Sequence, residues 1–349
     1  MKEKNNSYSD ILNQAITAHT NGNMHEAEKL YLECISLNNK DPIVLNNLAC
    51  ISYVQQNFEK SEHLFLDAIS ADPNYAEAYN NRGNIYKKIG DLIKANEYYQ
   101  KAIAINPKYA DAYSNLGILF QKEGDIQNAK KYFQKALSIN PGHRNFQNNL
   151  ATVLISTGRH EEACSILEKI ILEHADFIQA YMNLGQLLLE QKKYRKCFEV
   201  LEQAQSIQSI DPISYIQILI LQIYAGYNIC YWEKISEKKD KLSSMLEENN
   251  NIHDEFQTSP FYAQAIGLSS KHQNTLTKAF CHNIPGHSKY NASSTSQSSI
   301  IKIAYISPDF NQHPIALLLG TAFKFHNRNE FEIHAFSYDM YQSACWKMY

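Results

Sequence analysis

Asparagine recurs at one fixed spacing through the N-terminal part of the chain. It occupies the sixth position of six consecutive 34-residue frames: Asn13, Asn47, Asn81, Asn115, Asn149 and Asn183. A primary amide offers both hydrogen-bond donors and acceptors, so a row of amides suits the main chain of an extended peptide. Such an asparagine can also serve only to bond neighbouring helices. The unbroken row of six favours peptide binding over that alternative.

Cysteine and histidine do not have the spacing of a metal site. The seven cysteines include no C-x-x-C pair, which indicates reduced thiols and a cytoplasmic protein. Cys281, His282 and His287 lie close together, but a proline-glycine loop beside a polar linker is a poor zinc cage. The chain also has no glycine-rich phosphate loop. We therefore expect neither a metal nor a bound cofactor.

Composition argues against nucleic acid and membrane partners. Lys plus Arg total 33 and Asp plus Glu total 36, with no basic run to neutralise a phosphate backbone. The N-terminal residues lack the apolar run of a secretory signal. Residues 212–232 are uncharged and long enough to span a bilayer, but Gln217, Gln222 and Asn228 would be costly in hydrocarbon. A buried helix explains this segment better.

The elements that position the asparagines follow from the 34-residue period. The frames begin at Tyr8, Pro42, Ala76, Ala110, Arg144 and Ile178. Positions 8 and 20 of each frame are small, which predicts two helices that cross closely. Position 24 is always large and apolar, which predicts a side chain that fills the space between neighbouring hairpins. Glycines near position 15 and prolines near position 32 mark the ends of the two helices.

The third frame, YAEAYNNRGNIYKKIGDLIKANEYYQKAIAINP, resembles the tetratricopeptide repeat. The resemblance covers residues 8–211 as six repeats: 8–41, 42–75, 76–109, 110–143, 144–177 and 178–211. It implies an all-α solenoid, a right-handed superhelix whose first helices line a concave groove. The last two repeats depart from the pattern, with Gln147 for the usual aromatic residue, Lys192 for the turn glycine, and Ala175 and Ser209 for the closing proline.

Chaperone adaptors with such repeats bind a terminal carboxylate through lysines at positions 2 and 5 of the frame. Those positions hold no lysine here. They carry Ser9, Ile43, Glu77, Asp111, Asn145 and Gln179, then Leu12, Asn46, Asn80, Ser114, Asn148 and Met182. The sequence therefore disfavours a carboxylate clamp of that kind.

Beyond the repeats we expect closing helices and a connector at residues 212–286 and a polar linker at residues 287–299. The linker, HSKYNASSTSQSS, is of low complexity. After it, IKIAYIS and FEIHAFSY have the composition of strands, and PIALLLGTAFKFH has helical spacing opened by Pro314. A strand, helix and strand in this order begin a Rossmann-like sheet, so residues 300–349 are predicted to be a truncated βαβ fragment.

The segment KIAYISPDFNQHPIALLLGTAFKFHNRNEFEIHAFSYD is similar to the start of the catalytic region of glycosyltransferase family 41, the O-GlcNAc transferases. The similarity lies in Asp309, Phe310, His313 and Pro314. It implies that His313 lies near the acceptor hydroxyl, where a neutral imidazole can accept a proton. His313 could instead cap the helix that Pro314 opens. The asparagine row likewise resembles the one that holds substrate peptides in that family.

The family resemblance implies transfer of N-acetylglucosamine from UDP-GlcNAc to serine or threonine, without a metal. Plant relatives use GDP-fucose instead, so the sugar donor stays open. The donor-binding lobe is absent from the residues after the linker, so we expect this chain to bind peptide without transferring sugar alone. Detectable transfer from UDP-GlcNAc by the purified chain would contradict that expectation. The alternative function is a free-standing repeat scaffold for protein–protein interaction.

Overall fold

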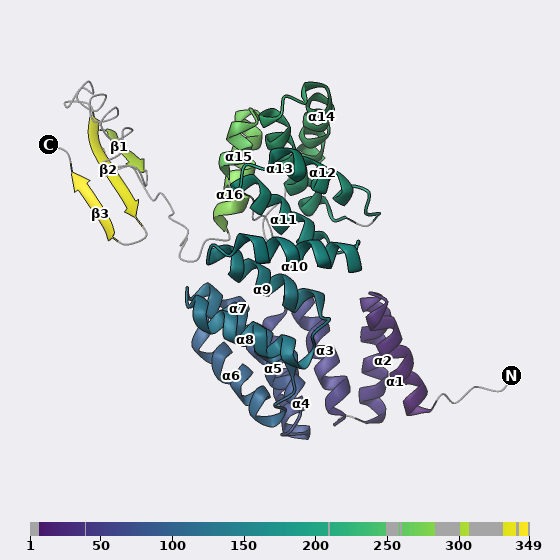
Figure 1. Cartoon of the computed structure of the whole chain (residues 1–349). Coiled ribbons are helices and arrows are strands. Elements are labelled where there is room, and N and C mark those ends of the chain that lie inside the picture. The colour runs from purple at the N-terminus through teal and green to yellow at the C-terminus, as the bar shows by residue number, and fades with distance from the viewer. Residues whose placement is uncertain are drawn as a thin grey trace. The chain divides into compact units, whose positions relative to one another are not determined.

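The computed structural model describes residues 7–38, 40–208, 210–248, 258, 260–282, 301–306, 331–339 and 342–347. The chain divides into two compact units, Met1–Asn283 and Ile284–Tyr349. The first unit is a solenoid of antiparallel helical hairpins (Figure 1). The predicted all-α repeat solenoid is therefore confirmed.

Twelve helices form six hairpins in chain order. The first helices of the hairpins are α1 (Tyr8–Thr20), α3 (Pro42–Val54), α5 (Ala76–Ile89), α7 (Ala110–Lys122), α9 (Arg144–Ser156) and α11 (Ile178–Glu190). The second helices are α2 (Met24–Leu37), α4 (Phe58–Ala71), α6 (Leu92–Ile105), α8 (Ile126–Ile139), α10 (His160–Glu173) and α12 (Tyr194–Ala204). Each first helix begins at the residue where its 34-residue frame begins.

The two helices of a hairpin cross where the sequence has small residues. A Cβ added at Gly117 would lie only 2.5 Å from a ring carbon of Phe133, the large residue at position 24 of the same frame. At position 20, the Ser61 hydroxyl donates to the Ala49 carbonyl across the same crossing, at 2.8 Å. Close approach of the helices is therefore possible only because both positions are small.

The turn inside each hairpin contains a residue with positive φ. Glycine fills this place in four repeats, with φ between 73° and 88°. Gln56 and Lys192 adopt the same conformation in the second and sixth repeats, with φ of 61° and 56°. The hairpin geometry is thus kept where the glycine is missing, at the cost of an unfavourable backbone conformation for a residue with a Cβ.

The fifth repeat compensates for its missing aromatic residue with an amide. Tyr113 and Tyr181 donate from their hydroxyls to the carbonyl six residues earlier, each at 3.3 Å. Gln147 stands at the equivalent position and donates from Nε2 to the Pro141 carbonyl at 2.9 Å. The departure from the repeat pattern therefore preserves the same tertiary hydrogen bond.

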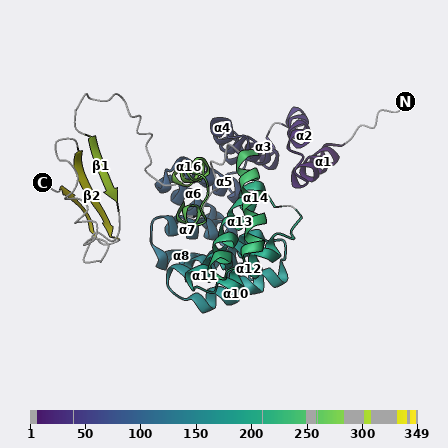
Figure 2. The same ribbon diagram turned by 90° about the horizontal axis from the view of Figure 1, so that it is seen from above.

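Four more helices close the solenoid: α13 (Pro212–Asn228), α14 (Trp232–Glu248), α15 (Pro260–Ala265) and α16 (Ser270–His282). Helix α13 lies between α12 and α14 and also contacts α11 and α15 (Figure 2). Ile218 and Leu221 belong to the core shared with the last repeats, and Leu219 and Ile223 to a second core under α14 and α16. Burial on both sides explains why this segment carries no charge.

The buried glutamines of α13 have protein partners, as expected for a buried helix. The side-chain Oε1 of Gln217 accepts hydrogen bonds from the backbone amide and the hydroxyl of Thr258, both at 3.1 Å. Gln222 accepts from Gln205 Nε2 at 2.7 Å and donates to the Phe198 carbonyl. Within the residues that the structure describes, no helix combines the length and the apolar character needed to cross a bilayer.

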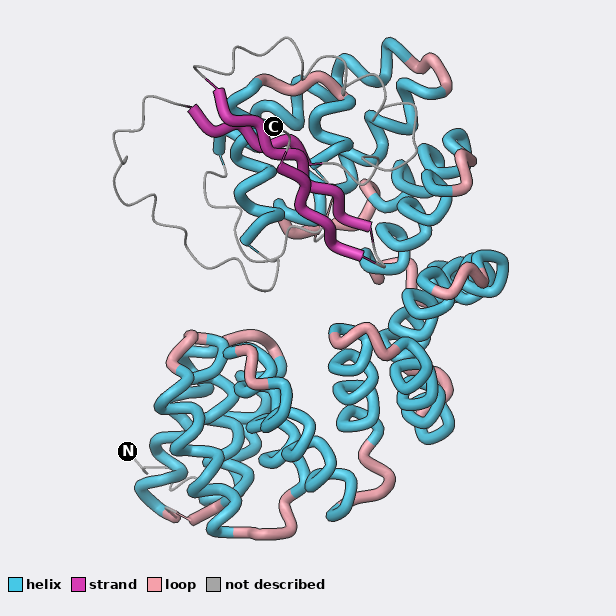
Figure 3. The backbone as a smooth tube through the Cα atoms, turned by 90° about the vertical axis from the view of Figure 1, so that its left-hand side faces the viewer, coloured by secondary structure: helices cyan, strands magenta, loops and turns pink. Residues whose placement is uncertain are grey.

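The described residues of the second unit form three strands, β1 (Ile301–Ile306), β2 (Phe331–Asp339) and β3 (Gln342–Lys347) (Figure 3). Strands β1 and β2 occupy the two segments expected to be strands and pair in parallel, with Ile301 opposite Phe331. Strand β3 pairs antiparallel with β2 and was not expected from the sequence. The segment predicted to be the intervening helix lies outside the described residues, so the Rossmann-like fragment remains a prediction.

Candidate functional site: an asparagine-lined inner surface

The six asparagines lie on the first helix of each repeat. From α3 to α11, each first helix contacts the first helix of the next repeat, in addition to its hairpin partner. Contacts between successive first helices place them along the inner side of the curved stack. Asn13 is exposed on α1, and the other five asparagines are half-buried. The asparagines therefore follow the inner surface, one for each repeat.

Four of the asparagines reach back to the preceding repeat. Each donates from Nδ2 to the residue at position 5 of the repeat before it. The four hydrogen bonds are Asn81 to Asn46 Oδ1 (3.1 Å), Asn115 to Asn80 Oδ1 (2.9 Å), Asn149 to Ser114 Oγ (3.4 Å) and Asn183 to Asn148 Oδ1 (2.8 Å). We call these four bonds the inter-repeat rungs.

The acceptors of the rungs are more buried than the donors. Asn46 and Asn80 are 3% exposed, Ser114 is 5% and Asn148 is 7%. Position 5 therefore belongs to the packing between repeats, whereas position 6 has a face on the groove. The bonding between neighbouring helices considered from the sequence is real. It uses one of the two N–H groups of Asn115, Asn149 and Asn183, whereas Asn81 Nδ2 also donates to Cys50 Sγ at 3.5 Å.

The remaining capacity of the position-6 amides differs along the row. Among the described residues, the Oδ1 atoms of Asn149 and Asn183 accept no hydrogen bond. Asn115 Oδ1 accepts from Lys87 Nζ at 3.1 Å, and Asn81 Oδ1 accepts from its neighbour Asn80. Since one bond already fixes each side chain, the groups left over have a defined direction. They can bond a ligand without first losing rotamer freedom.

A recess of about 400 Å³ opens on this surface between α7, α9 and α11. Its polar lining comes from positions 2, 5 and 6 of three successive repeats: Asp111, Ser114, Asn115, Asn145, Asn148, Asn149 and Gln179. Its aromatic lining comes from His143, Phe146 and Phe177. The rings of His143 and Phe146 stack with centroids 3.9 Å apart. A polar rim around aromatic side chains suits one side chain of a peptide whose main chain bonds to the amides.

Sequence reasoning missed the aromatic part of this recess. Phe146 stands at position 3 of its frame, where three other repeats have alanine: Ala78, Ala112 and Ala180. It is 3% exposed and points into the stack with His143. An aromatic residue at a position that is alanine in three of the six repeats was the available signal.

Burial keeps the ionisable groups near the start of the row neutral. Burial, with a smaller contribution from the nearby Glu77, raises the pKa of the Cys50 thiol to about 12. The same carboxylate accepts a hydrogen bond from the Tyr75 hydroxyl at 2.9 Å, and burial raises the pKa of Tyr75. A thiol with a raised pKa is a poor nucleophile. Cys50 instead accepts a hydrogen bond at Sγ from Asn81 Nδ2 at 3.5 Å, as part of the packing between the second and third repeats.

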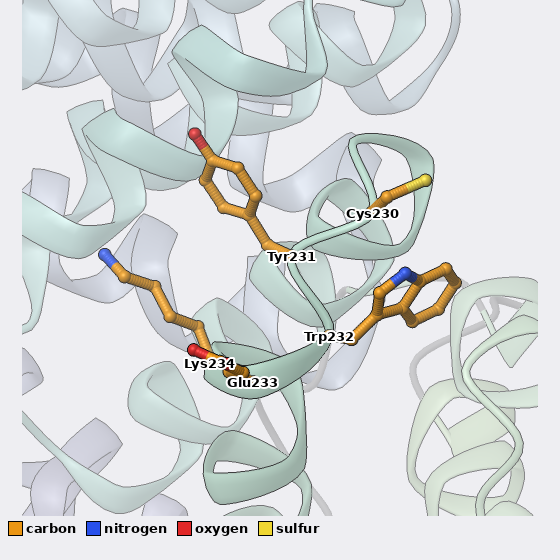
Figure 4. Close-up of a pocket in the computed structure, with 5 residues that line it drawn as sticks. All are labelled: Cys230, Tyr231, Trp232, Glu233 and Lys234. Carbon is orange, nitrogen blue, oxygen red and sulfur yellow. The ribbon is translucent and has the colours of Figure 1, made fainter.

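A second hollow, of about 410 Å³, lies at the turn between α13 and α14. Five consecutive residues line it, from Cys230 to Lys234. Tyr231 and Lys234 point to one side of the turn, whereas Cys230 and Trp232 point to the other (Figure 4). Trp232 is 58% exposed and contacts Tyr227. Polar groups do not converge here, so this hollow lacks the geometry of a ligand site.

His313 and the other residues of the glycosyltransferase-like motif lie outside the described residues. The possible roles of His313 therefore stay predictions. In the part of the chain that the structure describes, no three His, Cys, Asp or Glu side chains gather in a way that could hold a metal ion.

Comparisons with known proteins agree on the repeats. Profiles described as tetratricopeptide repeat match residues 11–41, 75–142, 120–182 and 178–211. No curated protein sequence matches the chain. Among solved structures, a tetratricopeptide repeat protein from Parabacteroides merdae is 16% identical with a TM-score of 0.52, and the match covers 78% of this chain and 98% of that one.

Two further structures are similar to a comparable degree. Pseudomonas aeruginosa PilF is 17% identical with a TM-score of 0.50, over 64% of this chain and 96% of that one. PilW, a type IV pilus biogenesis factor, is 19% identical with a TM-score of 0.50, over 60% of this chain and 93% of that one. At these identities the likeness concerns the fold alone.

The hairpins and their shared inner surface define an α-solenoid built from repeats. The period of 34 residues, the profile matches and the folded hairpins agree on its type. The chain is a tetratricopeptide-repeat protein.

Proposed function

We propose that the asparagine-lined inner surface binds an extended segment of a protein partner, chiefly through the main chain of that segment. The observation that carries the proposal is the arrangement at Asn149 and Asn183. In each, the rung to the preceding repeat fixes the amide, and Oδ1 accepts no hydrogen bond from the described residues. The row thus places one oriented amide in each repeat. The N–H and C=O groups of an extended main chain can form hydrogen bonds with these amides.

The recess between α7, α9 and α11 adds a place for one side chain. Its lining includes Asn115 and Asn149, so a main chain bonded to these amides passes its opening. The stacked rings of His143 and Phe146 favour an apolar or flat side chain there. The amides supply bonding that is independent of sequence, and the recess supplies part of the specificity.

A finer proposal follows from the resemblance to glycosyltransferase family 41. In it, the solenoid is the substrate-binding arm of a protein O-linked N-acetylglucosamine transferase that uses UDP-GlcNAc. Two features support it: the run of Asp309, Phe310, His313 and Pro314, and the parallel pairing of β1 with β2. The free-standing scaffold is the alternative, and peptide binding by the solenoid is common to both.

The test of peptide binding compares two triple variants that break the same three rungs. One is Asn81→Ala/Asn115→Ala/Asn149→Ala, which removes the groove-facing amides. The other removes their buried acceptors: Asn46→Ala, Asn80→Ala and Ser114→Ala. The probe is a pool of fluorescent peptides of about 12 residues, acetylated and amidated, which extend ~40 Å. Binding to the whole chain is measured by fluorescence anisotropy.

We expect the first variant to bind the pool about tenfold more weakly than wild type, because it loses hydrogen bonds to the peptide main chain. The second should stay within about threefold of wild type, although both should be destabilised by the loss of the rungs. Equal affinity of the first variant and wild type would assign these asparagines to packing alone. Circular dichroism verifies that both variants keep their helices.

A further inference from the structure

Lys87 occupies an unusual place on the inner surface. It lies near the C-terminal end of α5 and is half-buried, with Nζ donating to Asn115 Oδ1 at 3.1 Å. The amine also lies 5.9 Å from the centroid of the Tyr99 ring. Because Asn115 lines the recess, the Lys87 amine stands beside the path of the proposed peptide. Its position comes from a tertiary contact between repeats three and four.

The charge of Lys87 has no counter-charge within the described part of the protein. Among the described residues, no carboxylate lies within ion-pair distance of Lys87 or of Lys122. Seven other lysine or arginine side chains of the repeats do pair with carboxylates: Lys60, Arg82, Lys94, Arg144, Arg159, Lys169 and Lys196. An amine that is partly removed from water and left without an anion is unfavourable for the folded state.

Lys122 adds a second positive charge near the first. It is the last residue of α7 and is exposed. Burial lowers the pKa of Lys87 to about 8, and the Lys122 ammonium contributes to the lowering. Two neighbouring ammonium groups repel each other, and an anion between them offsets this repulsion. The pair therefore has the electrostatics of a site for a negatively charged group.

Negative charges of the same helices lie at their opposite ends. Glu77 precedes Lys87 by ten residues on α5, and Asp111 precedes Lys122 by eleven on α7. At 1.5 Å per residue these distances are roughly 15 Å along the helix axes. One border of the groove is thus negative and the other positive across repeats three and four. Glu123 follows Lys122 but makes no ion pair with it in the described structure.

We propose that Lys87 and Lys122 bind the carboxylate of an internal aspartate or glutamate side chain of the extended peptide. This inference rests on the proposed peptide binding and adds a specificity to it. The position-6 asparagines continue on both sides of the pair, with Asn47 and Asn81 before it and Asn149 and Asn183 after it. A peptide that used the whole row would pass the two lysines, so its side chain and not its C-terminus would supply the carboxylate.

The test uses two peptide pools that differ in one residue. Both are acetylated, amidated and about 12 residues long, with uncharged flanks. Their central residue is either Asp or Asn. A third pool has the Asn centre and a free C-terminal carboxylate. Affinities are measured for the wild-type chain, for Lys87→Met/Lys122→Met, and for the control Lys131→Met/Lys135→Met. The control lysines are exposed on α8, a second helix, and their loss changes the net charge equally.

We expect wild type and the control to prefer the Asp pool over the Asn pool by about tenfold, or about 1.4 kcal/mol. In Lys87→Met/Lys122→Met the preference should fall to about twofold or less. Equal binding of the two pools by wild type would overturn the inference and leave the proposed function standing. Preference for the free C-terminus over the Asp pool would also overturn it. Failure of every pool to bind wild type would overturn the proposed function and the inference together.

Discussion

The side chain of Lys87 is unfavourable for the folded state, yet it lies beside the path of the proposed peptide. Its ammonium donates to Asn115 Oδ1 but has no carboxylate partner among the described residues. Most lysines of the solenoid keep their amines in water, where charge costs little. The Lys87 amine is instead partly dehydrated, and its pKa is lowered to about 8, first by burial and then by Lys122. Because the ammonium of Lys87 is unfavourable for the folded state, we infer that it serves ligand binding and not packing.

Replacing Lys87 by methionine should therefore stabilise the protein at neutral pH. The pKa is lower in the folded state than its ordinary value of 10.5, so the unfolded chain binds the proton more tightly. Lys87 destabilises the folded state most below about pH 8, and this penalty disappears as the pH rises towards 10.5. We expect Lys87→Met to raise the free energy of unfolding by on the order of 1 to 3 kcal/mol at pH 7.

Urea unfolding of the variant and wild type at about pH 7 and about pH 9.5 measures this difference. The stability difference should shrink at the higher pH, because wild type then loses less by folding with a neutral amine. Lys131→Met, which removes an exposed amine from α8, should differ little from wild type at either pH. A variant less stable than wild type at pH 7 would show that the bond to Asn115 outweighs the desolvation.

At the scale of the element, the hairpin depends on how closely its two helices approach. In the third and fourth repeats the contact is made by glycine at position 8 against an aromatic ring at position 24. The sequence predicted this contact correctly, since small and large residues recur at fixed positions. Bonding of the position-6 asparagines to neighbouring helices was considered from the sequence, but their acceptors at position 5 could not be predicted. The pairing depends on the rotation between successive repeats, and the period alone does not determine it.

Gly117→Ala should destabilise the protein through this contact. A Cβ at Gly117 would lie 2.5 Å from Phe133 Cε1 and 2.9 Å from Cζ, which is closer than packed carbon atoms allow. Displacing a buried ring costs about 1–3 kcal/mol, which exceeds the gain of about 1 kcal/mol in helix propensity. We expect a net loss of about 1 kcal/mol, measured by urea unfolding.

Gly142→Ala is the matched control for Gly117→Ala. It lies in the turn before α9, and a Cβ there would meet no atom within 4 Å. The same chemical change should leave the stability within about 0.5 kcal/mol of wild type. Combining Gly117→Ala with Phe133→Leu should recover part of the loss, since leucine at position 24 already faces alanine at position 8 in the fifth repeat. Equal effects of both glycine variants would show that the ring of Phe133 yields without cost.

At the scale of the whole molecule, the sequence predicted the solenoid far better than its closing helices or its site. The same period of 34 residues applies to every hairpin, so an error in predicting one hairpin does not shift the prediction of the next. The closing helices have no repeat to constrain them. Thr258 donates a hydrogen bond to Gln217, which is 41 residues away, and no sequence pattern predicts that contact. The row of asparagines was visible in the sequence, but the lysine beside it became notable only once its partner, Asn115, was known.

A solenoid in which each hairpin contacts mainly its neighbours should respond locally to damage. The two ends have separate cores: Leu48 lies in the core of the first hairpins, and Leu276 in the core under α14 and α16. Both are almost fully buried, so truncation to alanine should cost about 2–5 kcal/mol at either site. Because stability in repeat arrays is transmitted through nearest-neighbour contacts, the loss should be felt most near the substitution.

Hydrogen exchange of the whole chain tests this expectation with two equivalent variants. Leu276→Ala should accelerate amide exchange in α13 and α16 and leave α1 and α2 close to wild type. Leu48→Ala should do the reverse, so each variant is the control for the other. In both, the central helices α5, α7 and α9, which carry the rungs and Lys87, should keep most of their protection. Uniform acceleration along the chain in either variant would instead show that the solenoid unfolds as one cooperative unit, and that damage at an end would reach the peptide-binding surface directly.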